Sequence, residues 1–275
     1  MTTPIISSFN NKGGVGKTNV IVNMAALAAN PEKPVLLIDA DQQGDASDAF
    51  GINKKAKGLF QIFHEEADLA ECVHAAPGVP GLWIIPPGEG MKELGRPSDV
   101  MESESRPKIS AFEYSKRLRA MVERISEGTP NGLSLAVVDL PPTFTTVTDF
   151  ALLASDRLLV PMKPSPESIK AIAELLEQVI QKRAYNPSLA ILGVVVTMFK
   201  KNSDQEQYVL QCHSSFPAET AFFETIIPEN QASSSAVSFD KPVVIYDKGG
   251  RGAKAYRALY VEFKARLQKE FAHVA

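Results

Sequence analysis

One glycine-rich stretch constrains this chain more than any other feature: Asn10-Asn11-Lys12-Gly13-Gly14-Val15-Gly16-Lys17-Thr18. An apolar run, residues 4–9, precedes the stretch, and a helical pattern, residues 19–29, follows it. Strand, glycine-rich loop and helix in this order are typical of a phosphate-binding P-loop. The glycines let backbone N–H groups face anionic oxygens, and the helix N-terminus adds positive partial charge. The stretch therefore predicts a phosphate site in which Lys17 contacts the β- and γ-phosphates and the Thr18 hydroxyl coordinates Mg²⁺.

This loop departs from the ordinary P-loop in one place. Asn11 stands where the ordinary motif has glycine, and a second lysine, Lys12, precedes Gly13-Gly14. With that lysine the stretch resembles the deviant Walker A motif, Lys-Gly-Gly-x-Gly-Lys-Thr, of the ParA/MinD/Soj family of ATPases. The resemblance implies ATP and Mg²⁺ as cofactors, and a homodimer in which Lys12 reaches the nucleotide of the other subunit. The nucleotide-binding residues expected here are Lys12, Gly13, Gly14, Val15, Gly16, Lys17, Thr18 and Asn19.

Length and composition fit one large α/β domain spanning residues 1–275. With 275 residues, 44% of them hydrophobic, the chain can bury a substantial core. The net charge is −3, so binding to nucleic acid would need a local basic patch. Cys72 and Cys212 have no CxxC partner, and the four histidines show no metal-ligand spacing. Without a signal pattern or an apolar run near the ~20 residues that span a bilayer, we expect a soluble, cytoplasmic protein.

A buried strand and an acidic loop follow the first helical pattern. Val35-Leu36-Leu37-Ile38 is a continuous apolar run, as in a parallel sheet covered on both faces. It leads into Asp39-Ala40-Asp41-Gln42-Gln43-Gly44-Asp45, at the kind of strand end where α/β sheets bind ligands. By spacing alone, a solvated acidic turn is the alternative. The loop resembles the family's switch I, Asp-x-Asp-Pro-Gln-Gly-Asn, which implies that Asp41 is the catalytic aspartate; Gln42 and Asp45 depart from that pattern.

A second strong strand also ends in an aspartate. Leu135-Ala136-Val137-Val138-Asp139 precedes Leu140-Pro141-Pro142. This matches the Walker B pattern, in which the carboxylate holds a water on Mg²⁺, although a capping aspartate is the structural alternative. Asp-x-Pro-Pro also resembles the family's switch II. The expected metal site contains Thr18, Asp41 and Asp139, and the expected catalytic residues are Lys12, Lys17, Asp41 and Asp139.

The remaining pattern alternates strands and helices, which predicts a three-layer, mostly parallel twisted sheet with helices on both faces. Strands are expected at 82–86, 157–161 and 190–199, and helices at 109–126, 148–154 and 166–184. Ser165 is expected to cap the last of these helices, and Ser203-Asp204-Gln205-Glu206 predicts a capping box. Residues 86–107, rich in Pro, Gly, Ser and charge, predict a surface loop or a partner-facing insertion.

Segments near the C-terminus extend the resemblance to about Glu262. They are Ile226-Ile227-Pro228-Glu229-Asn230, Ser238-Phe239-Asp240-Lys241-Pro242-Val243-Val244 and Gly252-Ala253-Lys254-Ala255-Tyr256. The resemblance implies that the strand end before Lys200 and the Pro228 loop flank the adenine. The corresponding residues are Met198, Phe199, Pro228 and Asn230. Between Asn230 and Ser238 the family usually carries a DNA-binding arginine, and this chain has none there.

A local excess of positive charge after Lys241 favours sequence-independent contacts with DNA phosphates. The basic residues are Lys241, Lys248, Arg251, Lys254, Arg257, Lys264, Arg266 and Lys269. The DNA-binding candidates are Lys200, Lys241, Lys248, Arg251 and Lys254. An ATP-bound dimer would double such a patch, so we expect weak, non-specific binding that depends on ATP.

The leading hypothesis is a dimerising ATPase that segregates a plasmid or chromosome, or places a protein cargo. A ParB-like or other cargo-adaptor protein would stimulate its slow hydrolysis, and the ATP-bound form would associate with the nucleoid. A MinD-like alternative uses Phe263, Leu267, Phe271 and Val274 as a membrane-binding helix, but apolar stripes usually pack in a core. The third hypothesis is a metabolic P-loop enzyme, such as a biotin-pathway ligase or an iron-protein reductase. The reductase would need cysteines that bind an iron–sulfur cluster, and Cys72 and Cys212 match no such motif.

Overall fold

The computed structural model describes residues 2–94, 109–216, 221–229 and 241–271. The predicted adenine contact Asn230 lies outside these ranges, as do Ser238 to Asp240 and Val274. So does most of the predicted surface loop. Of its described part, residues 91–94 form a short helix with Met91 and Leu94 buried, which corrects the expectation of a surface loop there.

The described residues form a seven-stranded sheet in the order β3-β4-β2-β5-β1-β6-β7. All neighbouring pairs are parallel except β3 and β4, which confirms the mostly parallel sheet. The strands are β1 Ile5–Ser8, β2 Val35–Asp39, β3 His74–Ala75, β4 Leu82–Ile85, β5 Leu135–Asp139, β6 Arg157–Met162 and β7 Ala190–Val196. The strand before the glycine-rich loop, β1, lies between β5 and β6, so that loop emerges at the centre of the sheet.

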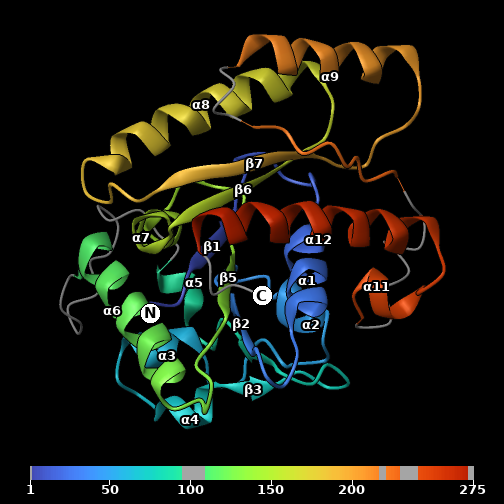
Figure 1. Ribbon diagram of the computed structural model, residues 1–275. Helices are drawn as coiled ribbons and strands as arrows, with labels where there is room; N and C mark the ends of the chain where they lie inside the picture. Colours follow the sequence, from blue (N-terminus) through green and yellow to red (C-terminus); the bar gives the residue numbers. More distant parts are fainter. Residues whose placement is uncertain (1, 95–108, 217–220, 230–240, 272–275) are drawn as a thin grey trace.

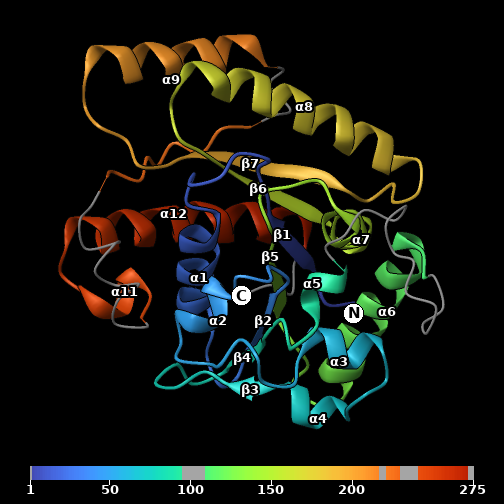
Figure 2. The same cartoon turned by 180° about the vertical axis from the view of Figure 1, so that it is seen from behind.

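Helices cover both faces of the sheet (Figures 1 and 2). They are α1 Lys17–Ala28, α2 Asp45–Asp48, α3 Leu59–Phe63, α4 Leu69–Cys72, α5 Met91–Leu94, α6 Ala111–Glu127, α7 Thr146–Ala154, α8 Pro166–Arg183, α9 Ser203–Ser215, α11 Val243–Tyr246 and α12 Arg251–Glu270. Ile5 belongs to the buried cluster under α6, α7 and α8, whereas Ile6 belongs to the cluster under α1 and α12. Successive strand residues therefore face two separate cores, which is why the strands are apolar without alternation.

One of two predicted helix caps is confirmed and the other was wrong. Ser165 is the N-cap residue of α8, as predicted, although its hydroxyl makes no cap bond to the helix backbone. The cap of α9 is Asn202, whose side chain accepts from the Gln205 N–H at 2.9 Å, and not Ser203. Serine and asparagine are both good N-caps, so sequence alone does not choose between adjacent candidates.

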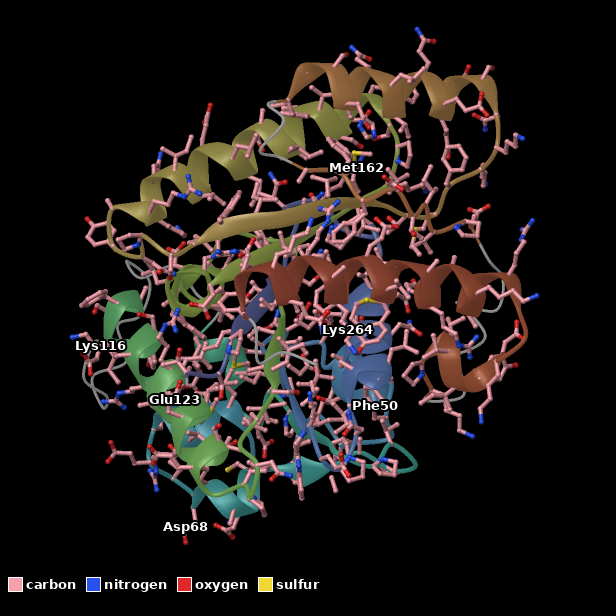
Figure 3. All side chains as sticks on the ribbon, viewed as in Figure 1. Phe50, Asp68, Lys116, Glu123, Met162 and Lys264 are labelled. Carbon is pink, nitrogen blue, oxygen red and sulfur yellow. The ribbon has the colours of Figure 1, made fainter. Side chains whose placement is uncertain are left out.

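The C-terminal helix α12 packs on the sheet. Phe263 and Leu267 are 1% and 0% exposed, within the core shared with α1. These are two of the residues on which the membrane-binding alternative depended, so that stripe faces the protein interior. Over the described ranges, no helix is long and apolar enough to cross a membrane. Figure 3 places Lys264 on this helix and Met162 at the end of β6.

Candidate nucleotide-binding site

The glycine-rich loop is shaped by glycines and by anchors on neighbouring strands. Gly14 and Gly16 have φ angles of 69° and 82°, in the left-handed region that only glycine adopts readily. The Asn10 side chain donates to the carbonyl of Pro161 at 2.8 Å, which fastens the start of the loop to β6. The Thr197 hydroxyl donates to the carbonyl of Val15 at 2.7 Å, which fastens its centre to the end of β7. The loop is therefore held in an anion-cradling form ahead of α1.

Lys17 is nearly buried at the base of this loop. It is 7% exposed, and its ammonium donates to the carbonyl of Lys12 at 3.2 Å. Burial lowers the pKa of Lys17, while the neighbouring carboxylates of Asp139 and Asp41 oppose that shift. A nearly buried cation at the base of a glycine-rich loop suits a phosphate chain carrying several negative charges.

Two of the predicted metal-site residues, Thr18 and Asp139, are 121 residues apart in the sequence but meet in the fold. The Thr18 hydroxyl donates to Asp139 Oδ2 at 2.7 Å. The other carboxylate oxygen, Asp139 Oδ1, is buried and has no hydrogen-bond partner within the described part of the chain. Burial raises the pKa of Asp139 well above its usual range, with a further contribution from Asp39. A hydroxyl next to an unsatisfied carboxylate oxygen fits Mg²⁺, which prefers oxygen ligands.

These carboxylates do not enclose a metal by themselves. No group of three His, Cys, Asp or Glu side chains among the described residues is arranged to hold an ion. That agrees with the usual Mg²⁺ site of a nucleotide enzyme, in which one or two protein ligands are completed by phosphates and water. Thr18 and Asp139 therefore fit a Mg²⁺ that arrives with the nucleotide.

Asp39 is a site residue that sequence reasoning missed. It ends β2 directly beside Asp139 in the sheet register and is fully buried. Its Oδ2 accepts from the backbone N–H and hydroxyl of Ser47, at 2.8 and 2.7 Å. Burial raises the pKa of Asp39 to about 7 despite these bonds. The available signal was its place at the end of an apolar strand, shared with Asp139.

Asp41 lies in the loop after β2. Its N–H donates to Asp39 Oδ1 at 3.2 Å, and its own carboxylate accepts from the Gln43 N–H at 2.9 Å. Burial raises the pKa of Asp41, and Lys17 lowers it by a smaller amount. This predicted catalytic residue is thus on the same side of the loop as Asp39 and Asp139, within electrostatic reach of Lys17.

Lys12 points away from the metal side and contacts its own chain. Its ammonium donates to the Ser165 hydroxyl at 2.9 Å and to Glu167 Oε2 at 3.0 Å, at the start of α8. The hydrogen bonds from Ser165 and Lys12 lower the pKa of Glu167 to about 2. Beside it, the Asn11 side chain donates to Glu174 Oε2 at 2.7 Å. No local sequence signal pointed to these α8 partners.

The predicted adenine residues lie together beyond the other side of the loop. Phe199 and Pro228 form a parallel bridge, and Phe199 donates to the carbonyl of Ile227 at 3.1 Å. Met198 has a φ of 51°, unusual for a residue with a side chain. A Cβ added at Gly16 would lie 3.6 Å from the Met198 methyl, so this strand end adjoins the P-loop. We call Met198, Phe199 and Pro228 the base wall.

The predicted DNA-binding residues are split between two places. Lys241, Lys248, Arg251 and Lys254 are all exposed around α11 and the start of α12. Lys200 lies next to the base wall and pairs with Glu229 at 3.0 Å. Arg266, counted in the basic segment, is not a free surface cation, because its guanidinium binds backbone carbonyls. The segment after Lys241 therefore has fewer free surface cations than its composition suggested.

Comparisons with known proteins agree with this geometry. A family model described as an AAA domain matches residues 3–191. The chain is 32% identical to the chromosome partitioning protein ParA of Caulobacter vibrioides, over 98% of this chain and 97% of that protein. It is 30% identical to the sporulation initiation inhibitor protein Soj of Bacillus subtilis, over 95% and 98%.

One solved structure shows how widely the fold is shared. Cobyrinic acid a,c-diamide synthase from Mycobacterium smegmatis, with bound ADP and magnesium, matches with a TM-score of 0.75, covering 98% of this chain and 97% of that one. At 17% identity this likeness concerns the fold alone. The fold therefore does not separate a partitioning protein from a metabolic enzyme, whereas the sequence relatives do.

Proposed function

The chain belongs to the ParA/Soj family of partitioning P-loop ATPases, and from that premise we propose that it binds ATP with Mg²⁺, dimerises and hydrolyses the ATP slowly. The cargo is a plasmid, a chromosome or a protein assembly, and a ParB-like or other adaptor protein stimulates hydrolysis. The observation that carries this proposal is the pairing of Thr18 with Asp139 at 2.7 Å, in a loop that also holds Lys12 and Lys17. A metabolic P-loop enzyme would share the pairing, so the choice of partitioning rests on the 32% identity to ParA over nearly the whole chain.

The site supports phosphoryl transfer mainly by positioning and charge. Backbone N–H groups of the loop and Lys17 hold the β- and γ-phosphates. Thr18 and Asp139 would hold Mg²⁺, which when bound neutralises charge on the phosphate oxygens. Asp41 orients the attacking water and accepts its proton, a role that its raised pKa suits. The base wall receives the adenine.

Dimerisation brings Lys12 to the partner's nucleotide. In this structure the Lys12 side chain is 34% exposed, and its ammonium is held by Ser165 and Glu167 at the start of α8. It must leave these contacts before it can bind a phosphate in the other subunit. Lys12 thus links the dimeric state to the charge stabilisation that hydrolysis needs.

The exposed basic residues suggest a surface for the ATP-bound dimer. Lys241, Lys248, Arg251 and Lys254 follow one another at the junction of α11 and α12. Phosphate contacts from such residues are independent of sequence and weaken with salt. We therefore place the protein in the cytoplasm, on the nucleoid when ATP is bound.

Gel filtration with ATP, with ADP and without nucleotide tests the proposal. Wild-type protein should elute as a dimer only with ATP and Mg²⁺. Lys17→Ala should lose nucleotide binding, and Lys12→Ala should retain ADP binding but remain monomeric with ATP. A Lys12→Ala variant that dimerises normally in ATP would refute the role of Lys12 across the dimer. A wild-type protein that binds no ATP would refute the whole proposal.

A further inference from the structure

Residues 221–229 support the base wall from outside, but they do not form a regular strand. The segment runs parallel to β7 between two bridges, Val194–Phe222 and Phe199–Pro228 (orange trace between β7 and α12, Figure 1). Phe223 donates to the carbonyl of Val194, and Ile227 donates to the carbonyl of Val196, both at 2.8 Å. Bonds in a parallel ladder are evenly spaced. Between these two bonds β7 advances by two residues, from Val194 to Val196, whereas the segment advances by four, from Phe223 to Ile227. The segment therefore bulges at Glu224 to Ile226.

Glu262 of α12 accepts hydrogen bonds from the N–H groups that this bulge leaves without partners on β7. Glu262 accepts from the N–H of Glu224 at 2.9 Å and from the N–H of Thr225 at 2.8 Å. It also accepts from the Thr225 hydroxyl. A bulge leaves backbone donors without ladder partners, and here the N–H groups of exposed Glu224 and half-buried Thr225 both bind one carboxylate. Glu262 therefore stabilises the extra residues in place.

Arg266, one turn further along α12, fastens the start of the segment to β7. Its guanidinium lies 3.9 Å from the centre of the Phe223 ring. A Cβ at Gly193 would lie 2.2 Å from Nη1, so this glycine admits the guanidinium. The three carbonyls that accept from Arg266 are those of Leu192, Ala221 and Phe222, at 2.8, 2.9 and 2.7 Å. A planar fork of donors can bridge both strands at once, which a lysine cannot do.

The opposite strand contains a matching irregularity at the base wall. After the bond to Val196, even spacing would make Met198 donate to the carbonyl of Ile227, but Phe199 does so instead. Met198 is thus one extra residue on β7, and its φ of 51° accommodates it. A strained residue persists where its surroundings over-determine it. The two irregularities together set Pro228 opposite Phe199.

We propose that Glu262 and Arg266 are positioning residues for the nucleotide base, acting through residues 221–229 on the base wall. The hydrogen bonds of both side chains go to Leu192 and to residues 221–225, ahead of the wall. They fix the segment whose far end, three residues beyond Thr225, carries Pro228. The inference rests on the proposed function, in which adenine binds against this wall, and it makes the C-terminal helix part of the nucleotide site.

Comparing ATP with inorganic tripolyphosphate tests the proposal, because tripolyphosphate has no base. Glu262→Gln keeps the size of the side chain but leaves an N–H of the bulge without an acceptor, and Arg266→Lys keeps only the charge. For each we expect the Kd for ATP with Mg²⁺ to rise about tenfold, as for the loss of a hydrogen bond to a charged group. The Kd for tripolyphosphate and the kcat at saturating ATP should stay within about twofold of wild type. Isothermal titration calorimetry and phosphate release give these values.

Glu270→Gln is the matched control, because this α12 carboxylate pairs with Arg157 and not with the segment. It should leave both affinities unchanged. An equal loss of affinity for ATP and tripolyphosphate, an unchanged ATP affinity, or the same shift in Glu270→Gln would overturn the proposal. If Glu262→Gln does not fold, Thr225→Val removes one donor to Glu262 and should give a smaller shift of the same kind. Failure of wild-type protein to bind either ligand would contradict the proposed function instead.

Discussion

At the residue scale, two loop residues hold the P-loop against α8. Asn11 donates to Glu174 and Lys12 to Glu167, so α8 holds both through acidic side chains. The Lys12 contact competes with any contact that Lys12 makes across a dimer, because one ammonium cannot occupy both places. The pair is well exposed, so the competition is weak and solvent-screened.

Glu167→Gln should make dimerisation in ATP easier. The substitution removes the charge that holds Lys12 in its own subunit, and we expect about a threefold lower dimer dissociation constant. Analytical ultracentrifugation in ATP with Mg²⁺ measures it. Glu177→Gln is the control, since this exposed residue of α8 has the same charge and does not bind Lys12. A weaker dimer in Glu167→Gln would show that Glu167 assists dimerisation.

Asp41→Ala should bind ATP and dimerise but hydrolyse it about 10²–10⁴ times more slowly, as expected for loss of a general base. The hydrogen bonds of Asp41 go to Asp39 and Gln43, while Thr18 binds Asp139, so nucleotide affinity should change little. Single-turnover phosphate release gives the rate, and the dimer should be long-lived. Wild-type turnover would transfer the catalytic role to another carboxylate, such as Asp39.

At the scale of elements, α12 serves both the core and the nucleotide site. One face buries Phe263 and Leu267 against the sheet, and Glu262 and Arg266 bind residues 221–225. Its outer face carries exposed residues such as Lys254 and Val261. A helix with these contacts is a structural part of the nucleotide-binding fold.

Phe263→Ala should destabilise the protein by about 3–5 kcal/mol, the usual result of deleting a buried aromatic ring. Phe263 is 1% exposed, whereas Val261 on the same helix is 67% exposed. Val261→Ala should therefore change stability by less than about 0.5 kcal/mol. Urea denaturation followed by circular dichroism compares them. Unchanged stability of Phe263→Ala, together with lost binding to liposomes, would restore the membrane-helix alternative.

At the scale of the whole molecule, the two sides of the P-loop have different tasks. The ends of β2 and β5 bring Asp39, Asp41 and Asp139 to one side, and the end of β7 brings the base wall to the other. The basic residues near α11 lie on the α1 and α12 face, away from α6 and α8 (Figures 1 and 2). Any DNA contact would thus use a different face from the α8 contacts of Lys12.

Duplex DNA should bind only the ATP-bound dimer, weakly and without sequence preference. Arg251→Ala/Lys254→Ala should lower the affinity by about tenfold or more and flatten its dependence on salt, because each dimer loses four phosphate-binding cations. Fluorescence anisotropy with unrelated duplexes across a salt series measures both. The control Lys116→Ala/Lys170→Ala removes exposed lysines from α6 and α8. Equal losses in both variants would indicate a diffuse charge effect, and no binding at low salt would exclude DNA as the surface.

Local pattern in the sequence determined the elements that carry the site. The strand at 135–139 and the helix starting at Pro166 were predicted at their observed positions, and the P-loop was recognised between its strand and helix. Such features depend on neighbouring residues: apolar runs, glycines at left-handed φ angles and a proline at a helix start.

Only the tertiary structure decided which side chains meet. The pairing of Asp39 with Asp139 depends on sheet register, and the contact of Lys12 with Glu167 depends on where α8 begins in space. The bulge held by Glu262 depends on a carboxylate that follows Thr225 by 37 residues. Contacts between residues so far apart leave no periodic pattern in a single sequence. Many sequences satisfy the same local pattern, and only the packing of the folded chain selects which side chains meet.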